Sequence, residues 1–289
     1  NIIIATGARS RQLPNIKQDG KHIIGYREAM NLKEKPESII IVGSGAIGVE
    51  FAYFYNAIGT KVTIVEYQSS IVPNEDRDIS KELEKIFKKN GIEILTETSV
   101  DKVLIEQQSV HVEINRKNKK ENIRATKLLS AVGIVSNIEN IGLESLNVAT
   151  SEGKITVNEY YETNLPNHFA IGDVVSGPSL AHVASAEAII CVEKIAGHNP
   201  EPLNYNNIPG CTYCSPEIAS VGMTEKEAVN NGFDIKVGKF PFSASGKASA
   251  SGKKEGFVKM IYDAKYGELL GAHMIGFNVT EMIAEIVAA

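Results

Sequence analysis

Several features are scarce in this sequence, and each scarcity excludes a class of protein. The chain of 289 residues contains only three cysteines and no tryptophan. Three cysteines cannot form a disulfide framework, so we expect a reducing compartment and a cytoplasmic protein. The 30 Lys and Arg residues are outnumbered by 35 Asp and Glu, which leaves no electrostatic footprint for a nucleic acid. The longest apolar stretch, residues 39–58, is interrupted by Glu50 and Asn56, so no membrane-spanning segment is predicted.

The remaining composition is typical of a globular chain with at least two domains. Apolar residues make up 43% of the sequence and charged residues 22%. The chain begins on an apolar strand, "NIIIATGAR", without an initiator methionine. It finishes on "VTEMIAEIVAA", a helical pattern without a stop signal. We therefore expect both termini to be internal points of a longer protein.

Apolar strands and amphipathic helices alternate in the first half of the chain. Strands are predicted at residues 2–5, 38–42, 61–66 and 92–95, and helices at residues 46–58 and 75–90. The first of these strands is expected to be buried. Residues 99–132 alternate more weakly, which predicts an antiparallel meander that includes the final apolar "LLSAVG". Strand–helix–strand alternation predicts an α/β fold with a right-handed parallel crossover.

The pattern changes after residue 135. A short strand at "HFAIGDVV" is followed by an Ala-rich helix that Gly197 ends. The proline-containing segment "HNPEPLNYNNIPG" is typical of a domain linker. Beyond it, four strand-like runs precede the last helix, which predicts an α+β domain with an antiparallel sheet.

The stretch "VGSGAIGVE", residues 42–50, lies between a predicted strand and a predicted helix. In this context Gly43 permits the tight turn out of the strand, and Gly45 leaves the backbone open to a phosphate. Gly48 lets the helix lie close to the sheet. The helix N-terminus offers free N–H groups and a positive dipole end to a pyrophosphate.

Glu66 turns this bend into a predicted dinucleotide site. It ends the next strand, 18 residues after Gly48, where the adenosine ribose of a bound dinucleotide lies. A carboxylate there accepts hydrogen bonds from both ribose hydroxyls and repels a 2′-phosphate. The alternative is a solvent-exposed acid at a strand end. The register of strand, glycines, helix and acid favours NAD(H) over NADP(H).

Glu50 is predicted to lie in the first turn of the helix that follows the glycines, where the helix dipole favours an anion. Val49 and Phe51 flank it, so its carboxylate is expected to be partly buried. Such an acid beside a nicotinamide site suggests a structural or redox role with a cationic partner.

Six segments resemble the pyridine nucleotide–disulfide oxidoreductases, and among them most closely the dihydrolipoamide dehydrogenases. These segments are "IIIATGAR", "VGSGAIGVEFA", "VTIVE", "FAIGDVVSGPSLAHVASAEA", "CSPEIASVGMTE" and "GELLGAHMIG", in the order of that family. The resemblance implies a Rossmann-like NAD-binding domain inserted in a partial FAD-binding domain, followed by an α+β interface (dimerisation) domain. The expected boundaries are 1–36 and 135–203 for the FAD-binding parts, 37–134 for the NAD-binding domain and 204–289 for the interface domain.

The resemblance also implies two cofactors, FAD and NAD, and the residues that contact them. FAD is expected at Thr6, Gly7, Ala8, Asp173, Ser179, Leu180, Ala181 and His182. NAD is expected at Gly43, Ser44, Gly45, Ala46, Ile47, Gly48, Val49, Glu50, Glu66, Val100 and Gly133. In the family the Gly-Asp aspartate binds the ribityl chain of FAD, and the acid that matches Glu50 pairs with a lysine near the flavin.

The catalytic groups that the resemblance implies are not found in this sequence. The family uses a Cys-x4-Cys disulfide and a C-terminal His–Glu pair, and we expect them upstream of Asn1 and downstream of Ala289. Cys211 and Cys214 form a C-x-x-C, but no helix follows directly and two cysteines cannot complete a zinc site. They are interpreted as packing thiols, and no metal site and no catalytic residue are predicted.

The function implied is the oxidation of dihydrolipoamide through a disulfide and FAD, with NAD⁺ as the acceptor, in a homodimer. The expected partners are the lipoyl domains of a 2-oxo acid dehydrogenase complex or of a glycine cleavage system. Two alternatives remain open. One is another flavin disulfide reductase or an NADH oxidase relative, and the other is a non-catalytic NAD-binding dimerisation module. Many relatives carry Gly-Arg-x-Pro where this sequence has "GIVS" within "AVGIVSN". Gly133 is kept, but Ile134 and Val135 remove one expected charge near the cofactor.

Overall fold

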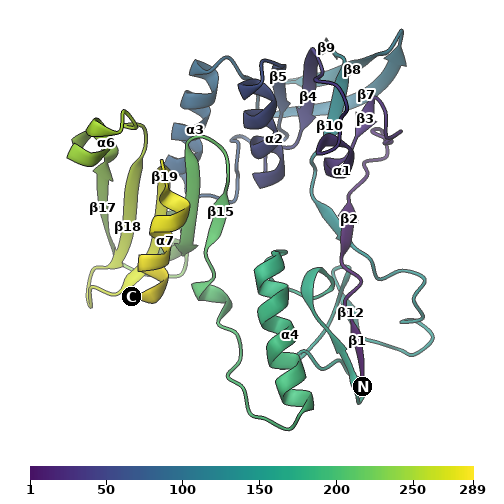
Figure 1. Ribbon diagram of the computed structural model, residues 1–289, viewed down its shortest axis with the longest axis vertical. Coiled ribbons are helices and arrows are strands. Elements are labelled where there is room, and N and C mark those ends of the chain that lie inside the picture. Colours follow the sequence, from purple (N-terminus) through teal and green to yellow (C-terminus); the bar gives the residue numbers. More distant parts are fainter. The chain divides into compact units, whose positions relative to one another are not determined.

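A computed structural model describes residues 1–289, and the chain divides into two units that alternate along the sequence (Figure 1). Residues 1–10 and 134–208 form unit 1, and residues 11–133 and 209–289 form unit 2. This division differs from the expected boundaries. Residues 11–36 pack with residues 37–133, because the strand at residues 23–24 joins the sheet of that segment.

A five-stranded parallel sheet forms the centre of the first half of unit 2. Its strands, in spatial order, are β3 (Ile23–Ile24), β10 (Lys127–Ser130), β4 (Ser38–Val42), β5 (Lys61–Val65) and β6 (Glu93–Leu95). Each neighbouring pair is parallel, with Ile40 opposite Thr63 on one side and Leu128 on the other. The predicted α/β crossover unit is therefore confirmed, and its central strands are buried as parallel strands require.

Helices cover one face of this sheet, and the second and third begin and end near the predicted residues, whereas the first was not predicted. They are α1 (Tyr26–Ala29), α2 (Ala46–Ala57) and α3 (Arg77–Lys89). Gly59 and Gly91 each follow a helix end with a positive φ, as the C-cap pattern predicts. The Asp76 side chain caps α3 by accepting a hydrogen bond from the Asp78 N–H.

The antiparallel meander predicted for residues 99–132 packs on the other face of the sheet, but it is shorter than expected. It consists of β7 (Thr98–Glu106), β8 (Ser109–Arg116) and β9 (Lys119–Ala125). Alternate strand residues divide between the layers, since Ile40 packs toward the meander and Ile41 toward the helices. The apolar segment at 127–130 joins the parallel sheet as β10 instead, which corrects its assignment to the meander.

The second half of unit 2 is the predicted α+β domain with an antiparallel sheet. Its strands, in spatial order, are β15 (Gly210–Thr212), β16 (Glu217–Gly222), β19 (Leu269–Gly276), β18 (Phe257–Asp263) and β17 (Ile235–Pro241). The helices are α5 (Glu225–Asn230), α6 (Gly246–Ala250), α7 (Val279–Ala288) and the 3₁₀ turn η3 (Phe242–Ala244). Helix α7 packs against β16 and β19, and Figure 1 shows it next to β19.

The two halves of unit 2 share one hydrophobic core. Ile218, Phe257 and Ile275 of the antiparallel sheet belong to the same buried cluster as Leu83 and Phe87 of α3. This shared core explains why the two halves form one unit although residues 134–208 separate them in sequence.

Unit 1 contains short strands in pairs and one long helix. The pairs are β1 (Ile2–Ile4) with β14 (His168–Ala170), β2 (Ala8–Ser10) with β11 (Ile134–Ser136), and β12 (Thr150–Ser151) with β13 (Lys154–Ile155). The helices are α4 (Ala181–Ile195) and the 3₁₀ turns η1 (Gly172–Val174) and η2 (Tyr205–Asn207). The first strand is not buried as predicted, since Ile2 is 55% exposed and β14 is its only strand partner. None of the helices in either unit is long and apolar enough to span a membrane.

Candidate nucleotide-binding sites

The close packing of α2 on β4 explains two of the three glycines in the bend at residues 43–48. Gly43 has a φ of +98°, and a Cβ there would lie 2.4 Å from the carbonyl oxygen of Ala131 in the neighbouring segment. A Cβ on Gly48 would lie 2.1 Å from the carbonyl oxygen of Gly43. Both distances are far below van der Waals contact, so these positions require glycine for the fold itself.

Gly45 differs from its two neighbours because no atom lies within 4 Å of the position of its absent Cβ. Its φ of −66° is available to any residue, so the backbone does not require glycine here. Gly45 is the N-cap of α2, and no side chain caps this helix end. The open space and the uncapped N–H groups are what a phosphate needs for close approach.

Glu66 lies directly after β5 and points back to the glycine bend. Its side chain is almost fully buried, with 7% exposure. Oε2 accepts hydrogen bonds from the N–H of Ser44 at 2.8 Å and from Ser44 Oγ at 2.6 Å. Oε1 accepts one from the N–H of Gln68 at 2.7 Å. The acid and the bend, 22 residues apart, therefore form one structure.

These bonds limit what Glu66 can offer a ligand. A carboxylate has about four acceptor positions, and the chain itself fills three of them. About one position, on Oε1, stays available, whereas the sequence argument assigned both ribose hydroxyls to this group. One direct hydroxyl contact fits the observed geometry without breaking a protein hydrogen bond.

A cavity of about 550 Å³ opens in front of the bend. Of the residues predicted to bind NAD, it brings together Gly43, Ser44, Gly45, Glu66, Val100 and Gly133. Its other lining residues include Leu13, Pro73, Asn74, Thr98 and Ser99, which sequence reasoning missed. They come from the start of β7 and from loops, and their positions depend on the fold and not on a local pattern.

The other predicted NAD residues do not line this cavity. Ala46, Ile47 and Gly48 lie in the first turns of α2, and the Val49 side chain is fully buried beneath them. Glu50 is the fifth residue of α2, and the first turn contains no acid, which corrects its predicted position. Its Oε1 accepts a hydrogen bond from the N–H of Tyr213 at 2.8 Å.

In unit 1 the residues predicted to bind FAD gather at one edge of the β1–β14 pair. These strands are parallel, with Ile4 opposite Ala170, so the turn at Thr6 and the turn at Asp173 leave from the same edge. The carboxyl edge of parallel strands is where ligands of α/β folds bind. Ser136 Oγ donates a 2.6 Å hydrogen bond to the carbonyl oxygen of Asp173 and ties β11 to this turn.

The turn at residues 6–8 is held by Asn137. Thr6 Oγ1 donates to the carbonyl oxygen of Asn137 at 2.6 Å, and the Asn137 N–H donates to the carbonyl oxygen of Gly7 at 2.8 Å. Gly7 has a φ of +68°, with no atom within 4 Å of a Cβ position. The turn therefore has room for a ligand, and Ala8 begins β2 directly after it.

The N-terminal end of α4 supplies the remaining predicted FAD residues. Leu180 is the N-cap and makes no side-chain capping bond, while Ser179, Ala181 and His182 are exposed. A 15-residue helix with an uncapped, exposed N-terminus presents free N–H groups and a positive dipole end. The predicted role of this segment beside a reduced flavin is compatible with that geometry.

Glu187 on α4 is a site residue that sequence reasoning missed. It is 1% exposed, and its Oε2 accepts a 2.6 Å hydrogen bond from the N–H of Gly172, next to Asp173. Oε1 accepts a 2.5 Å hydrogen bond from Tyr205 Oη. The Tyr161 hydroxyl oxygen lies 3.1 Å from Tyr205 Oη. Burial and the carboxylate raise the pKa of Tyr205. A lone acid within the Ala-rich run "ASAEAII" was the available signal.

The C-x-x-C cysteines have the properties of packing thiols. Cys214 is 4% exposed, and burial, with the nearby Glu50 carboxylate, raises the pKa of its thiol to about 12. Burial also raises the pKa of Cys211. A thiol that stays protonated at neutral pH is a poor nucleophile. The interpretation of these cysteines as packing residues agrees with the structure.

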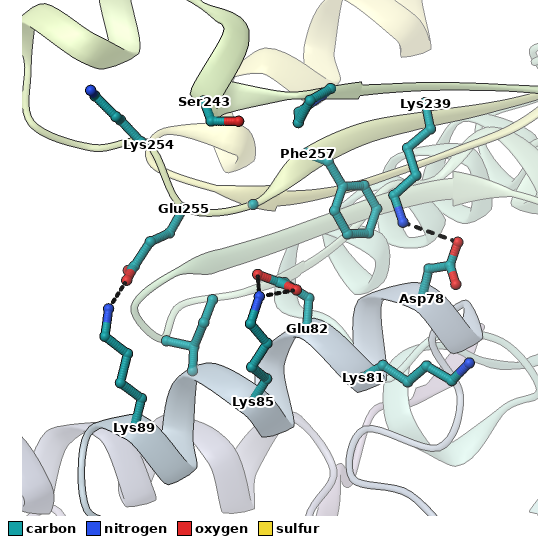
Figure 2. A pocket seen from close by; sticks show the side chains of 13 residues that line it. Asp78, Lys81, Glu82, Lys85, Lys89, Lys239, Ser243, Lys254, Glu255 and Phe257 are labelled. Carbon is teal, nitrogen blue, oxygen red and sulfur yellow. Dashed lines mark hydrogen bonds and ion pairs between the residues drawn. The ribbon is translucent and has the colours of Figure 1, made fainter.

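A second cavity, of about 610 Å³, lies between α3 and the β17–β18 strands (Figure 2). Five lysines line it, but three of them pair with acids of the same cavity. Figure 2 shows these pairs as Lys85–Glu82, Lys89–Glu255 and Lys239–Asp78, at 3.0–3.2 Å. The charges largely cancel, so this groove is a weaker candidate for an anion than the bend at Gly45.

Comparison with protein families identifies the fold. Residues 1–188 match the pyridine nucleotide-disulphide oxidoreductase model, and residues 208–289 match the dimerisation domain of the same family. The chain belongs to the pyridine nucleotide-disulphide oxidoreductases. The predicted fold class and family are confirmed, and FAD and NAD are the cofactors expected of its members.

Similar curated proteins are dihydrolipoyl dehydrogenases. The chain is 48% identical over 285 residues to the one from Zymomonas mobilis, and the alignment covers 98% of this chain and 61% of that protein. It is 46% identical over 286 residues to the one from Bacillus subtilis, with 98% and 60% coverage. The chain therefore spans about three fifths of the length of these relatives.

Solved structures of flavin enzymes have the same fold. LpdA from Mycobacterium tuberculosis has a TM-score of 0.90 at 27% identity and covers 99% of this chain and 62% of that one. The HOCl-induced flavoprotein disulfide reductase RclA from Escherichia coli has a TM-score of 0.89 at 28% identity, with 99% and 66% coverage.

Proposed function

We propose that unit 2 binds NAD(H) in the cavity in front of Gly45. The observation that carries this proposal is the contact of Glu66 with Ser44, which joins a carboxylate to an open, uncapped helix N-terminus. The pyrophosphate would lie on the N–H groups at the start of α2, and a ribose hydroxyl would donate to Glu66. The buried carboxylate would repel a 2′-phosphate, so NADH is favoured over NADPH.

The flavin site of unit 1 would be formed by the turns at Thr6–Ala8 and Asp173 and by the start of α4. The Asp173 carboxylate forms no hydrogen bond within the chain and is partly exposed, so it can accept a hydrogen bond from a ribityl hydroxyl. The N-terminus of α4 would stabilise negative charge on the reduced ring. When both cofactors are bound, they supply hydride transfer between flavin and nicotinamide.

The reaction of the whole protein would be the oxidation of dihydrolipoamide with reduction of NAD⁺. The similarity to dihydrolipoyl dehydrogenases at 46–48% identity supports this substrate. Cysteines occur only at residues 191, 211 and 214, so this chain contains no Cys-x4-Cys pair. We therefore expect the 289-residue chain alone to bind nucleotide but not to turn over dihydrolipoamide.

The remaining parts of the proposal concern assembly and location. The match of residues 208–289 to a dimerisation domain supports a homodimer. The expected partners are the lipoyl domains of a 2-oxo acid dehydrogenase complex or of a glycine cleavage system. Three unpaired cysteines are compatible with a cytoplasmic location.

Two measurements test the proposed function. The fluorescence of NADH should rise and saturate when the chain is added, because the nicotinamide enters a less polar environment. The full-length protein should reduce NAD⁺ with dihydrolipoamide, while the 289-residue chain should not. Failure of the chain to bind NADH would contradict the nucleotide site. Turnover by the chain alone would contradict the proposal that this chain lacks catalytic groups needed for the reaction.

A further inference from the structure

Ser44 is fully enclosed within the glycine bend. Its exposure is 0%, whereas Gly45 next to it is exposed. Both of its donors, the N–H and Oγ, point to Oε2 of Glu66, at 2.8 and 2.6 Å. In this arrangement both Ser44 donors are used by the acid at the wall of the cavity. Ser44 is therefore placed to hold Glu66, while the glycine after it stays open to the ligand.

The carbonyl oxygen of Ser44 is fixed from a third direction. It accepts a 2.9 Å hydrogen bond from the N–H of Val72, in the segment between β5 and α3. Val72 has a φ of +40°, in the left-handed region that a β-branched residue rarely adopts. Its own carbonyl oxygen accepts hydrogen bonds from the Glu75 N–H and from Ser80 Oγ. Strained backbone of this kind persists only where its surroundings over-determine it.

The segment that follows Glu66 is thus attached to the bend at two points. Glu66 holds the N–H side of Ser44, and Val72 holds its C=O side. Pro73 and Asn74, directly after Val72, line the nucleotide cavity. Because a hydrogen bond to a charged acceptor is stronger than a neutral one, the Glu66 bonds are the larger contribution to this attachment.

We infer that Ser44 and Glu66 act as a pair that fixes the phosphate-binding bend before the nucleotide arrives. Ser44 is the positioning residue, and Glu66 both anchors the bend and receives the ribose. This inference rests on the proposed function and adds a consequence to it. Loss of the Glu66 carboxylate should disturb the pyrophosphate site as well as the ribose contact, so removal of its charge does not by itself convert the site to NADPH.

The two roles of Glu66 predict different behaviour of the same variants. If Glu66 were a ribose acceptor only, Glu66→Gln would weaken NADH and strengthen NADPH, and Ser44→Ala would change neither. If the pair fixes the bend, both variants weaken both nucleotides. For each variant, we expect the dissociation constant of NADH to rise about tenfold, the effect of losing hydrogen bonds to a charged group. That of NADPH should rise as well.

A double-mutant cycle separates this positioning role from a general loss of structure. Calorimetric titrations with NADH and with NADPH would compare the unsubstituted chain, Ser44→Ala, Glu66→Gln and the double variant. If Ser44 acts through Glu66, the double variant binds NADH no more weakly than Glu66→Gln alone. Ser69→Ala, an exposed serine of the next loop, is the matched control and should leave both dissociation constants unchanged.

The possible results have distinct meanings. Unchanged NADH affinity in Ser44→Ala, additive effects in the double variant, or a gain of NADPH affinity in Glu66→Gln would each overturn the inference while the proposed function stands. Absence of NADH binding by the unsubstituted chain would overturn both.

One measurement on the unsubstituted chain does not depend on the folding of any variant. Without nucleotide, the amide hydrogens of Ser44 and Val72 should exchange slowly. The Ser44 N–H is bonded to the Glu66 carboxylate, and the Val72 N–H is bonded to the carbonyl oxygen of Ser44. Rapid exchange of the Ser44 amide in the nucleotide-free chain would overturn the inference.

Discussion

The two candidate cofactor sites share one structural feature but differ in how it can serve a ligand. In each, a buried carboxylate accepts a hydrogen bond from the N–H of a turn that is expected to contact the ligand. Glu66 accepts from Ser44 in the nucleotide site of unit 2, and Glu187 accepts from Gly172 in the flavin site of unit 1. Glu66 also lines its cavity, whereas the second oxygen of Glu187 bonds Tyr205. Only the first acid is placed to touch a ligand.

The sites differ as well in how the chain assembles them. The glycine bend and its acid lie within residues 42–66, on one strand–helix–strand unit. The flavin residues come from two distant segments, residues 6–8 and residues 173–182, and a third segment at residues 136–137 bonds to both turns. All the residues that line the nucleotide cavity belong to unit 2 of this chain, so the nucleotide site is the one that can be tested first.

The largest expected effect comes from Lys259, which links the two halves of unit 2. Its ammonium group is 2% exposed and lies 2.8 Å from Asp76, 2.6 Å from Glu225 and 3.3 Å from Asp78. Lys259→Met leaves these acids without their cation and should lower the free energy of unfolding by about 4 kcal/mol. Chemical denaturation would measure it. Lys236→Met, on an exposed face of the next strand, is the control and should cost little.

The same cluster predicts an acid limit for unit 2. The ammonium of Lys259 and the N–H of Asp78 outweigh burial and lower the pKa of Asp76 below its usual 3.8. A lowered folded-state pKa contributes stability that is present above pH 3.8 and is lost as the pH falls through the folded value. Denaturation midpoints of the unsubstituted chain should fall below about pH 4, and Asp76→Asn should flatten this fall. An equal acid dependence in both proteins would exclude Asp76 as its source.

The next effect compares two glycines of the nucleotide site. Gly48→Ala places a Cβ 2.1 Å from the Gly43 oxygen and should destabilise the protein by about 3 kcal/mol. Gly45→Ala meets no atom and should cost less than about 1 kcal/mol, yet it narrows the cavity where the phosphate binds. We expect Gly45→Ala to fold normally and to lose NADH affinity. Equal stability of the two variants would contradict the packing argument.

A smaller effect is expected on the flavin side. Glu187→Gln replaces a carboxylate that accepts two hydrogen bonds with an amide that can satisfy only one of the two donors well. The loss should be about 2 kcal/mol, measured by chemical denaturation. Glu193→Gln, on the exposed face of the same helix, should be neutral. A neutral Glu187→Gln would show that the buried acid does not hold the Gly172 turn.

The smallest effect concerns the Arg9–Glu139 pair near the flavin turn. Arg9 donates to both oxygens of Glu139, at 2.8 and 3.0 Å, but both side chains are about half exposed. The guanidinium lowers the pKa of Glu139 to about 2, so the pair stays ionised at neutral pH. Glu139→Gln should leave the unfolding free energy unchanged within error, because exposed pairs contribute little. A large loss of unfolding free energy in Glu139→Gln would contradict the expectation that this exposed pair contributes little to stability.

Local patterns were sufficient to predict the nucleotide bend. The roles of Gly43 and Gly48 follow from a strand that turns directly into a helix, and the backbone geometry of that turn is nearly invariant. Helix ends were predictable for the same reason. Asp76 caps the start of α3 by bonding the N–H two residues later, and Gly91 follows the helix end with a positive φ.

Features that depend on contacts between distant segments were not predictable. The bond from Ser44 to Glu66 and the one from Gly172 to Glu187 join residues 22 and 15 positions apart through the tertiary fold. The apolar strand at 127–130 has the same pattern in either sheet, so only its partner β4 decides where it lies. Glu50 was assigned to the first helical turn, although the correctly predicted start at Ala46 makes it the fifth residue of α2.

The most direct test of the account is the ratio of NADH to NADPH affinity for the unsubstituted chain, measured by calorimetry in the same buffer. A buried Glu66 carboxylate at the ribose position predicts that NADH binds at least about tenfold more tightly than NADPH, because a 2′-phosphate would face this negative charge. Equal affinities, or tighter binding of NADPH, would contradict the assignment of Glu66 to the ribose.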